Sequence, residues 1–373
     1  MLIAVFIMRY WNRCLLRILL LLPVAAAHAQ PIVFVPGKTV PYSSSATVTT
    51  LAGAADSKGS TDAVGPDARF AWPMGLAVAP DGTLYVVDEE NMTVRKITAT
   101  GAVTTLAGTA GSKGSADSAG PAARFYHPVG LALDAGGMLY VTDADNHTIR
   151  KVSPAGEVTT LAGAPGRKGS ADGSGATAQF NLPHGMAVDA SGTVYVADTE
   201  NHTIRKITPA GAVSTLAGAA RHKGSVDGQG ANARFYHPAA VAVDGAGNVY
   251  VADNGNHTIR KIGADGTVTT LAGHAKRHGG ADGPGASARF FFPTGLAVDA
   301  IGNVYVADYL NANIRKISPT GEMSTLAGAV LQGGHLDGPG PDARFQGPSG
   351  IAVDANGTLY VTDGPTVRVI KQF

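Results

Sequence analysis

One short pattern returns along this chain at a fixed interval of 55 residues. Leu-Ala-Gly begins at Leu51, Leu106, Leu161, Leu216, Leu271 and Leu326, and a tyrosine and an aspartate, first seen as Tyr85 and Asp88, keep the same interval in all six copies. Self-similarity at a fixed period is the sequence signature of a repeat architecture, in which each unit buries its apolar face against the next. The fold is therefore expected to contain six equivalent units.

Each copy contains the pattern of four short strands. In the third copy, apolar or β-branched runs cover residues 185–189, 193–198, 202–207 and 213–216, and turn residues such as Ser191-Gly192 separate them. This pattern predicts a four-stranded antiparallel meander. The first two runs are apolar at almost every position, as in a sheet that is covered on both faces, whereas the outer two carry Thr, Arg and Lys.

The ends of the chain favour a closed ring over an open stack. Radial stacking of six such sheets gives an all-β, six-bladed propeller, whereas linear stacking gives a solenoid. The sixth copy stops at Phe373 without a fourth strand, and residues 46–51 form a strand-like run that precedes the first copy. We therefore predict that the N-terminal strand completes blade six and closes the ring, which leaves no open blade face.

At this point the residues resemble a known family. The stretch Pro183-x-Gly185-Met-Ala-Val-Asp189-x-x-Gly192-x-Val-Tyr-Val-Ala-Asp198-x-x-Asn201-His202-x-Ile-x-Lys206 is similar to the NHL repeat. The resemblance covers residues 47–373 and implies a six-bladed β-propeller. Copy six departs from it at Asp363-Gly-Pro-Thr-Val-Arg368, which is two residues shorter and lacks Asn-His. Ala79 replaces an aspartate, and Ala240 replaces a glycine, which indicates that this glycine position does not need a positive φ.

The first 29 residues have the order of a secretory signal peptide. Arg9, Arg13 and Arg17 precede an apolar run of about ten residues, and Ala27-His28-Ala29 supplies small residues for cleavage. We predict a signal peptide over 1–29, a flexible segment over 30–45 and the propeller over 46–373. An uncleaved anchor is the alternative, although the apolar run is shorter than the roughly 20 residues that span a bilayer. The expected location is secreted or periplasmic, without stable membrane insertion after cleavage, whether translation starts at Met1 or Met8.

Charge and cysteine content exclude several classes of function. Lys and Arg number 29 against 28 Asp and Glu, so the chain has no basic excess for gripping a phosphate backbone, and we expect no nucleic acid partner. The single cysteine, Cys14, lies in the predicted signal peptide. The mature chain is therefore expected to use neither disulfides nor thiolate chemistry.

Residues that recur in every copy are assigned to architecture, and function is sought where the repeat is broken. The tyrosines are expected to pack between blades with bonded hydroxyls, and the Asp88 set is expected to bond turn backbone or an arginine of the Arg95 row. Each copy is joined to the next by a loop of about 20 residues. Alternate connections of a meander emerge on alternate faces, so we expect these loops and the Asn-His turns on the same face. In each loop an aspartate, first seen as Asp62, precedes Ala-Arg-Phe by six residues in five copies and Ala-Gln-Phe in the other. That spacing predicts an Asp–Arg pair within the loop.

The candidate ligand-binding residues break the repeat on this loop face. They are Trp72, His127, His184, His237 and Phe292, which stand at or next to the entry to the innermost strand. His127, His184 and His237 suggest a three-imidazole metal site as an alternative, because catalytic zinc is often held in this way. They do not occupy one repeat position, however, and we expect rim histidines, no catalytic residues, no metal and no cofactor. His147, His202 and His257 are interpreted as turn residues.

Two further motifs carry weaker signals. Lys58, Lys113, Lys168 and Lys223 open Lys-Gly-Ser segments, but the order of a phosphate-binding loop is absent, which favours solvated turns. Asp143-Ala-Asp145-Asn146 lacks the invariant glycine and final glutamate of a calcium loop.

Two functions from different classes fit these observations. The first is an exported, non-catalytic binding module, monomeric, whose long-loop face engages a protein, peptide or glycan. The second is a metal-dependent propeller hydrolase or lyase, because related propellers include lactonases, amidating lyases and streptogramin lyases, a resemblance that implies a central cation. The repeat position of His184 reads Met, Val, His, Ala, Thr, Ser, and it supplies one imidazole where an amidating-lyase-like site needs several. The sequence therefore favours the binding module.

Overall fold

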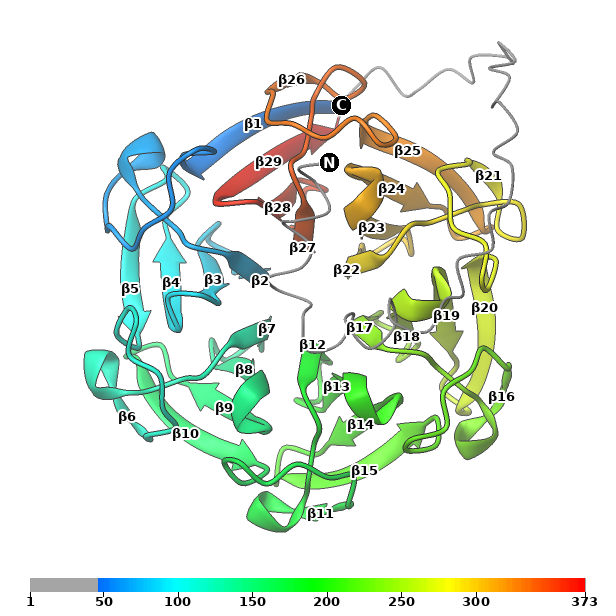
Figure 1. Cartoon of the computed structure of the whole chain (residues 1–373), viewed down its shortest axis with the longest axis horizontal. Helices are drawn as coiled ribbons and strands as arrows, with labels where there is room; N and C mark the ends of the chain where they lie inside the picture. Colours follow the sequence, from blue (N-terminus) through cyan, green and yellow to red (C-terminus); the bar gives the residue numbers. More distant parts are fainter. Residues whose placement is uncertain (1–45, 373) are drawn as a thin grey trace, which may run out of the picture. The chain divides into compact units, whose positions relative to one another are not determined.

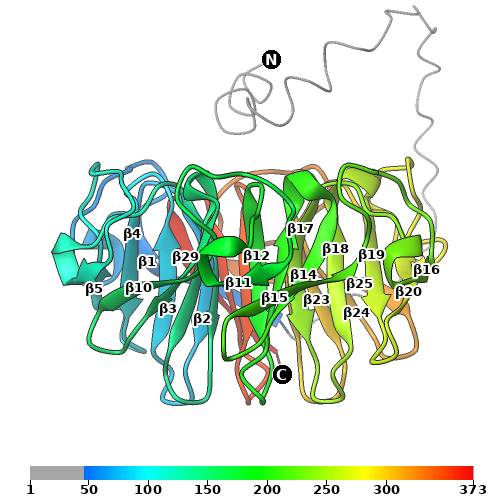
Figure 2. The same cartoon turned by 90° about the horizontal axis from the view of Figure 1, so that it is seen from below.

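Six antiparallel sheets stand around a central axis in the computed structural model, which describes residues 46–372 (Figure 1). The predicted signal peptide (1–29) and the segment 30–45 lie outside the described residues. Each sheet runs outward from an innermost strand (Figure 1), and the long loops lie on one face of the ring (Figure 2). Within residues 46–372, no helix has the length and apolar character needed to cross a bilayer.

The blades follow one another in chain order. Blade one contains β2 (Pro73–Val78), β3 (Leu84–Asp88), β4 (Thr93–Ile97) and β5 (Val103–Ala107). Blade two contains β7 (Pro128–Leu133), β8 (Leu139–Asp143), β9 (Thr148–Val152) and β10 (Glu157–Ala162), with β6 (Ser118–Ala119) outside β10. Blade three contains β12 (Pro183–Val188), β13 (Val194–Asp198), β14 (Thr203–Ile207) and β15 (Ala212–Ala217), with β11 (Gly173–Ser174) outside β15.

The other three blades repeat this order. Blade four contains β17 (Pro238–Val243), β18 (Val249–Asp253), β19 (Thr258–Ile262) and β20 (Thr267–Gly273), with β16 (Gly228–Gln229) outside. Blade five contains β22 (Pro293–Val298), β23 (Val304–Asp308), β24 (Asn313–Ile317) and β25 (Glu322–Gly328), with β21 (Gly283–Pro284) outside. Blade six contains β27 (Pro348–Val353), β28 (Leu359–Asp363), β29 (Thr366–Gln372) and β1 (Ala46–Gly53), with β26 (Gly338–Pro339) outside.

Short 3-10 helices lie in the long loops and in the turns between the second and third strands. They are η1 (Gly65–Asp67), η2 (Gly120–Ala122), η3 (Ala144–Asn146), η4 (Gly175–Thr177), η5 (Thr199–Asn201), η6 (Gly230–Asn232), η7 (Asn254–Asn256) and η8 (Tyr309–Asn311). The predicted four-stranded blades are thus confirmed. The two-residue strand that each long loop adds to the outer edge of five sheets was not predicted.

The ring is closed by the two ends of the described chain, as predicted. Strand β1 pairs antiparallel with β29 from Ala46 opposite Gln372 to Gly53 opposite Thr366. The N-terminal strand therefore supplies the outer strand that the sixth copy lacks. Strand β29 is then paired on both of its edges, by β1 and by β28.

Glycines on the innermost strands allow the blades to approach one another closely. A Cβ on Gly75 would lie 2.6 Å from the carbonyl oxygen of Val129, and one on Gly185 would lie 2.6 Å from that of Ala239. Neither glycine has a positive φ. The interpretation of Ala240 is therefore confirmed, because close packing rather than backbone conformation requires glycine at this repeat position.

The recurring tyrosines bond as expected. The hydroxyl of Tyr195 donates to Asp189 at 3.1 Å, and Tyr140, Tyr250, Tyr305 and Tyr360 make the same bond in their own copies. In the first copy Ala79 stands at this aspartate position, so Tyr85 has no such acceptor.

A fully buried arginine ties each long loop to its blade. In blade three, Arg205 donates from Nη1 to Asp198 and from Nη2 to Asp172, both at 2.7 Å. Asp198 ends β13, whereas Asp172 lies in the loop that enters the blade and also accepts bonds from the backbone N–H and hydroxyl of Thr215. The guanidinium lies 5.1 Å from the centre of the Phe180 ring. We call this arrangement the arginine latch; its equivalents centre on Arg95, Arg150, Arg260, Arg315 and Arg368.

The predicted Asp–Arg pair within each loop is wrong. Asp62 binds Arg95 of β4 at 2.6 Å, whereas Arg69 of the Ala-Arg-Phe segment donates to the carbonyls of Pro66 and Ala68. Arg69 is partly exposed and is solvated, but Arg95 is completely buried and requires carboxylate partners. Burial therefore decides which arginine the loop aspartate binds.

The latch predicts a large cost for removing one guanidinium. Arg205→Met leaves Asp198 buried without its cation, so the free energy of unfolding in urea should fall by about 3–5 kcal/mol. The matched control is Arg167→Met, because Arg167 lies exposed in the same loop, and surface substitutions usually change stability by less than about 0.5 kcal/mol. A loss below about 1 kcal/mol for Arg205→Met would contradict this role.

Candidate functional site

The entry to the innermost strand has an unusual backbone in four blades. His127, Leu182, His237 and Phe292 have φ values of 51°, 50°, 49° and 57°, a left-handed conformation that costs a non-glycine residue about 1–3 kcal/mol. Hydrogen bonds from the preceding blade hold three of them. The backbone N–H groups of Leu182, His237 and Phe292 donate to Nδ1 of His147, His202 and His257 at 3.2–3.3 Å.

These contacts confirm the turn histidines as architectural residues. His147, His202 and His257 each adopt a left-handed conformation at the end of the turn between the second and third strands. Burial lowers the pKa of His202 and of His257 to about 4. Both imidazoles are therefore neutral at pH 7. A neutral ring lets Nδ1 of His257 accept its backbone hydrogen bond, whereas Nδ1 of His202 also lies 3.0 Å from the carbonyl oxygen of Thr199, to which an Nδ1–H would donate.

Two of the candidate histidines pair with glutamates across a blade boundary. His127 Nδ1 lies 3.2 Å from Glu89 Oε1, and His237 Nδ1 lies 3.0 Å from Glu200 Oε1. The hydrogen bond to Glu89 raises the pKa of His127 above its usual value. The hydrogen bond between His127 and Glu89 thus joins blades one and two on the loop face. His237 and Glu200 lie close across the boundary between blades three and four, but His237 Nδ1 makes no hydrogen bond there.

His184 lies on β12, where the innermost strands surround the central axis. Its side chain is half-buried, and desolvation lowers its pKa to about 4. Glu200 and Asp145 act against this shift, whereas the neighbouring His237 adds to it. His184 is consequently a neutral imidazole near two carboxylates at physiological pH.

The aromatic candidates belong to ring clusters at the same rim. Lys58 Nζ lies 4.8 Å above the centre of Trp72, and the Phe292 ring meets His257 edge-on at 4.7 Å. Lys113 and Lys223 cover Tyr126 and Tyr236 at 5.0 and 4.7 Å in the same way. The predicted solvated turns therefore include lysines that engage aromatic rings by cation–π contacts.

The structure does not bring the five candidates into one cluster. His184 and His237 interact electrostatically, whereas Trp72, His127 and Phe292 contact residues of their own or the preceding blade. Among residues 46–372, no group of three or more His, Cys, Asp or Glu side chains is placed to hold a metal ion. The structure therefore does not gather His127, His184 and His237 into such a group.

Several residues of this rim were not predicted from the sequence. Tyr126, Tyr236 and Phe291 precede the candidates by one position, and Phe291 stacks on His278 with ring centres 4.2 Å apart. That position reads Ala, Tyr, Asn, Tyr, Phe, Gln through the six copies, so the same search for broken symmetry would have found it. Glu89 and Glu200 were missed because their histidine partners lie in the next blade.

The comparisons with known proteins agree with this architecture. The NHL repeat model matches residues 70–97, 125–152, 180–207, 235–262 and 345–371. The chain therefore carries NHL repeats, arranged as a six-bladed NHL-repeat propeller. It is 32% identical over 316 residues to SUPPRESSOR OF QUENCHING 1, chloroplastic, of Arabidopsis thaliana, which covers 78% of this chain and 29% of that protein. The chain thus spans less than a third of this relative.

Two solved structures show the same fold at lower sequence identity. An auxiliary nutrient binding protein from Bacteroides ovatus superposes with a TM-score of 0.67 at 19% identity, covering 89% of this chain and 78% of that one. A gluconolactonase from Xanthomonas campestris gives a TM-score of 0.54 at 17% identity, covering 82% and 87%. At these identities the similarity establishes the fold alone.

The neutral state of His184 predicts a specific pH dependence. Its folded pKa of about 4 lies below the ordinary 6.5, so the unfolded chain binds more protons between these values. The stability contributed by His184 is present above pH 6.5 and is lost as the pH falls towards 4. Between pH 7.5 and 4.5, the wild type should therefore lose more unfolding free energy than His184→Asn, by on the order of 1 kcal/mol.

Comparing the two proteins cancels the titration of groups that both retain. His274→Asn serves as the control, because His274 is exposed on a loop. Identical pH dependence in the wild type and His184→Asn, measured by urea unfolding, would contradict a neutral imidazole at this position.

Proposed function

We propose that this protein is a non-catalytic binding module that holds a protein, peptide or glycan on its long-loop face. The supporting observation is the rim of aromatic and ionisable side chains at the entries to the innermost strands. On the opposite face, the turns between the first and second strands carry small or polar residues at one repeat position. These are Gly136, Ser191, Ala246 and Asn356, and Ile301 is the large exception. Aromatic rings beside hydrogen-bonding groups are typical of recognition surfaces.

The loop face is divided into two sectors of different chemistry. The turns after the second strand carry Glu89, Glu90, Asp145 and Glu200 in blades one to three. The equivalent turns of blades four to six carry Asn254, Tyr309 and Gly364 instead, and Phe291 and Phe292 lie beside them in blade five. A ligand that offers polar or cationic groups on one side and an apolar group on the other would complement this surface.

The fold alone does not distinguish a binding protein from an enzyme, so the residues of the site must decide. A metal-dependent hydrolase or lyase is the competing function, and one of the structural neighbours is a gluconolactonase. His127 and His237, however, lie beside Glu89 and Glu200, and His184 lies on the innermost strand β12. The three histidines are therefore not gathered into one set of metal ligands. This arrangement favours binding.

A combined substitution tests the proposed surface. Trp72→Ala, His237→Ala and Phe292→Ala together should abolish pull-down of binding partners from the protein's own extracellular or periplasmic fraction, because truncated hot-spot residues typically cost 2 kcal/mol or more each. The melting temperature should fall by only a few degrees. The matched control is Ser191→Ala, Ile301→Ala and Asn356→Ala on the opposite face. Unchanged pull-down by the loop-face variant would contradict the proposal.

We also propose that the protein is exported. The support is the charge and hydropathy order of residues 1–29. Intact mass spectrometry of protein from the exported fraction should show a chain that begins at Gln30. A mass that retains Met1 or Met8 would instead indicate an uncleaved anchor.

A further inference from the structure

The long loops over blades four and five are basic. Residues 218–235 and 273–290 carry six lysines or arginines against two aspartates. Residues 328–345 and 53–70, which form the loops over blades six and one, carry three against five. Each of the two aspartates in the basic loops already pairs with the buried arginine of its own latch. The positive charge of these two loops is therefore not balanced within them.

Four of the six cations are exposed at the turns of these loops. Arg221 and Lys223 lie over blade four, and Lys276 and Arg277 lie over blade five, its neighbour in the ring (Figure 1). We call these four residues the basic arc. None of the ion pairs formed within residues 46–372 includes any of them. The other two cations are arginines that donate to backbone carbonyls.

The neighbouring turns explain why the arc has no carboxylate partner. In blade one, Lys58 pairs at 2.9 Å with Glu90, which lies in the turn after the second strand. Lys223 is the equivalent of Lys58 in blade four, but Gly255 stands at the position of Glu90 there, and Leu310 stands at it in blade five. The carboxylate that neutralises the loop cation of blade one is thus missing beside the arc.

The backbone of the repeat gives no reason for these cations. Copies two and three carry Gly111 and Gly166 at the position of Arg221 and Lys276, and their φ values are 74° and 73°. Arg221 and Lys276 take the same left-handed conformation, with φ values of 66° and 67°. Glycine adopts it readily, whereas residues with a side chain do so rarely. Two long cationic side chains therefore stand where the turn itself favours glycine.

The aromatic rings beside the arc are already packed. Lys223 Nζ lies 4.7 Å from the centre of Tyr236, and His278 stacks on Phe291 with ring centres 4.2 Å apart. Each ring also contacts the ring of the next residue along the chain. Single-stranded nucleic acids are typically held on open aromatic faces, on which their bases stack. The arc offers charge without such open faces, which favours a polyanion that is recognised through its charged groups alone.

We propose that the basic arc binds an acidic polysaccharide, a chain of sugars that carries carboxylate or sulfate groups at regular intervals. This inference rests on the proposed function, because it names a ligand class for one part of the long-loop face. Blades four and five present their cations from equivalent turns, so the charges recur around the ring as the blades do. A linear polymer with evenly spaced anions complements this arrangement, and each arginine can bind one carboxylate or sulfate through two parallel hydrogen bonds.

Titration calorimetry with oligogalacturonate and with dextran sulfate tests the arc, because the two probes separate carboxylate from sulfate recognition. The variant replaces Arg221, Lys223, Lys276 and Arg277 with glutamine. Its Kd for the bound probe should rise on the order of 10-fold or more, because the attraction between the polyanion and the arc is lost. Binding by the wild type should weaken roughly 10-fold or more between about 50 and 200 mM NaCl, since salt screens exposed charges.

The matched control removes the same charge elsewhere on the ring. It replaces with glutamine four lysines at one position of the third strands, Lys96, Lys151, Lys206 and Lys261. Its Kd should stay within twofold of the wild type, and a neutral maltooligosaccharide should not compete with the acidic probe. The melting temperature of the arc variant should not change, because exposed substitutions rarely alter stability.

Equal binding by the wild type and the arc variant, or no binding of either acidic probe, would overturn the proposal. Tighter binding of oligothymidylate or of phosphatidylserine vesicles through the arc would overturn the assignment to a polysaccharide. The variant of Trp72, His237 and Phe292 separates this inference from the proposed function. If that variant loses pull-down but the wild type binds no acidic probe, the loop face binds a ligand and the arc does not. If pull-down is unchanged but the arc variant loses the probe, the arc is a binding site and the aromatic rim is not.

Discussion

Each blade is organised around a guanidinium that has no access to water. Such a charge is stable only when carboxylates neutralise it. In each blade Nη1 and Nη2 donate to carboxylates, whereas Nε is buried without a hydrogen-bond partner. One aspartate comes from the end of the second strand, but the other comes from the loop that enters the blade, as Asp172 does for Arg205. The requirement for this second carboxylate folds every long loop back over its own blade. The ordered loop face is thus a consequence of burying the arginine.

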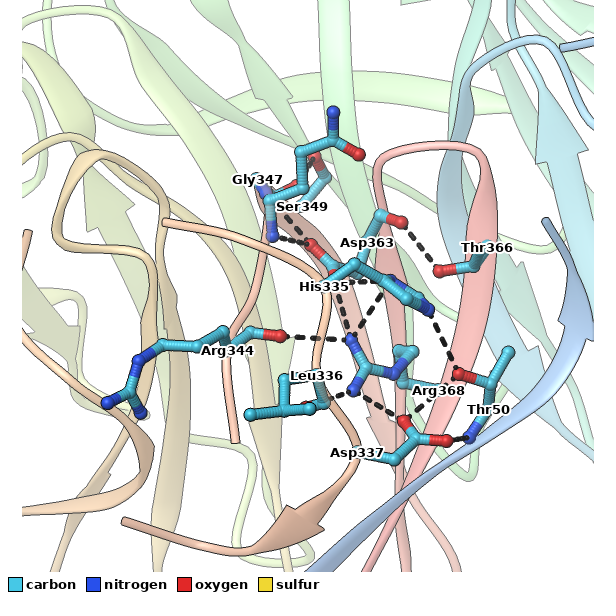
Figure 3. Close-up of polar contacts among 11 residues, drawn as sticks. Thr50, His335, Leu336, Asp337, Arg344, Gly347, Ser349, Asp363, Thr366 and Arg368 are labelled. Atoms are coloured by element: carbon cyan, nitrogen blue, oxygen red, sulfur yellow. Dashed lines mark hydrogen bonds and ion pairs between the residues drawn. The ribbon is translucent and has the colours of Figure 1, made fainter. Parts of the chain in front are cut away.

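The repeat supplies the scaffold, and its departures supply the individual features of the molecule. Where the turns carry Glu89 and Glu200, the rim histidines of the next blades find partners. In blade five the turn carries Tyr309, whose ring lies 3.0 Å from the position that a Cβ on Gly347 would take. Glycine at this point of blade six therefore accommodates the aromatic ring from blade five. In the loop of blade six, His335 lies beside Thr50 of β1 and Arg368 of β29 (Figure 3).

Much of the fold follows from sequence because the signals are local and occur six times. The strand order, the closure by residues 46–51, the tyrosine bonds and the turn histidines were all confirmed. The wrong pairing of Asp62 with Arg69 shows the limit, because spacing along the loop does not report which arginine is buried. Contacts between neighbouring blades, such as His127 with Glu89, depend on the distance between sheets, which a linear pattern does not contain. His335 was missed because its partner Thr50 lies 285 residues away in the chain.

The two ends of the described chain form one sheet, and the closed ring depends on this pairing. Thr47 stands opposite Lys371 in the pairing of β1 with β29, and directly opposed residues in antiparallel strands are close enough for a disulfide. With Cys14 replaced by serine, Thr47→Cys and Lys371→Cys should form an intramolecular disulfide in native protein, and the oxidised chain should unfold at higher urea concentration than the reduced one. Free thiols or intermolecular dimers under the same oxidation would contradict a ring closed by these strands.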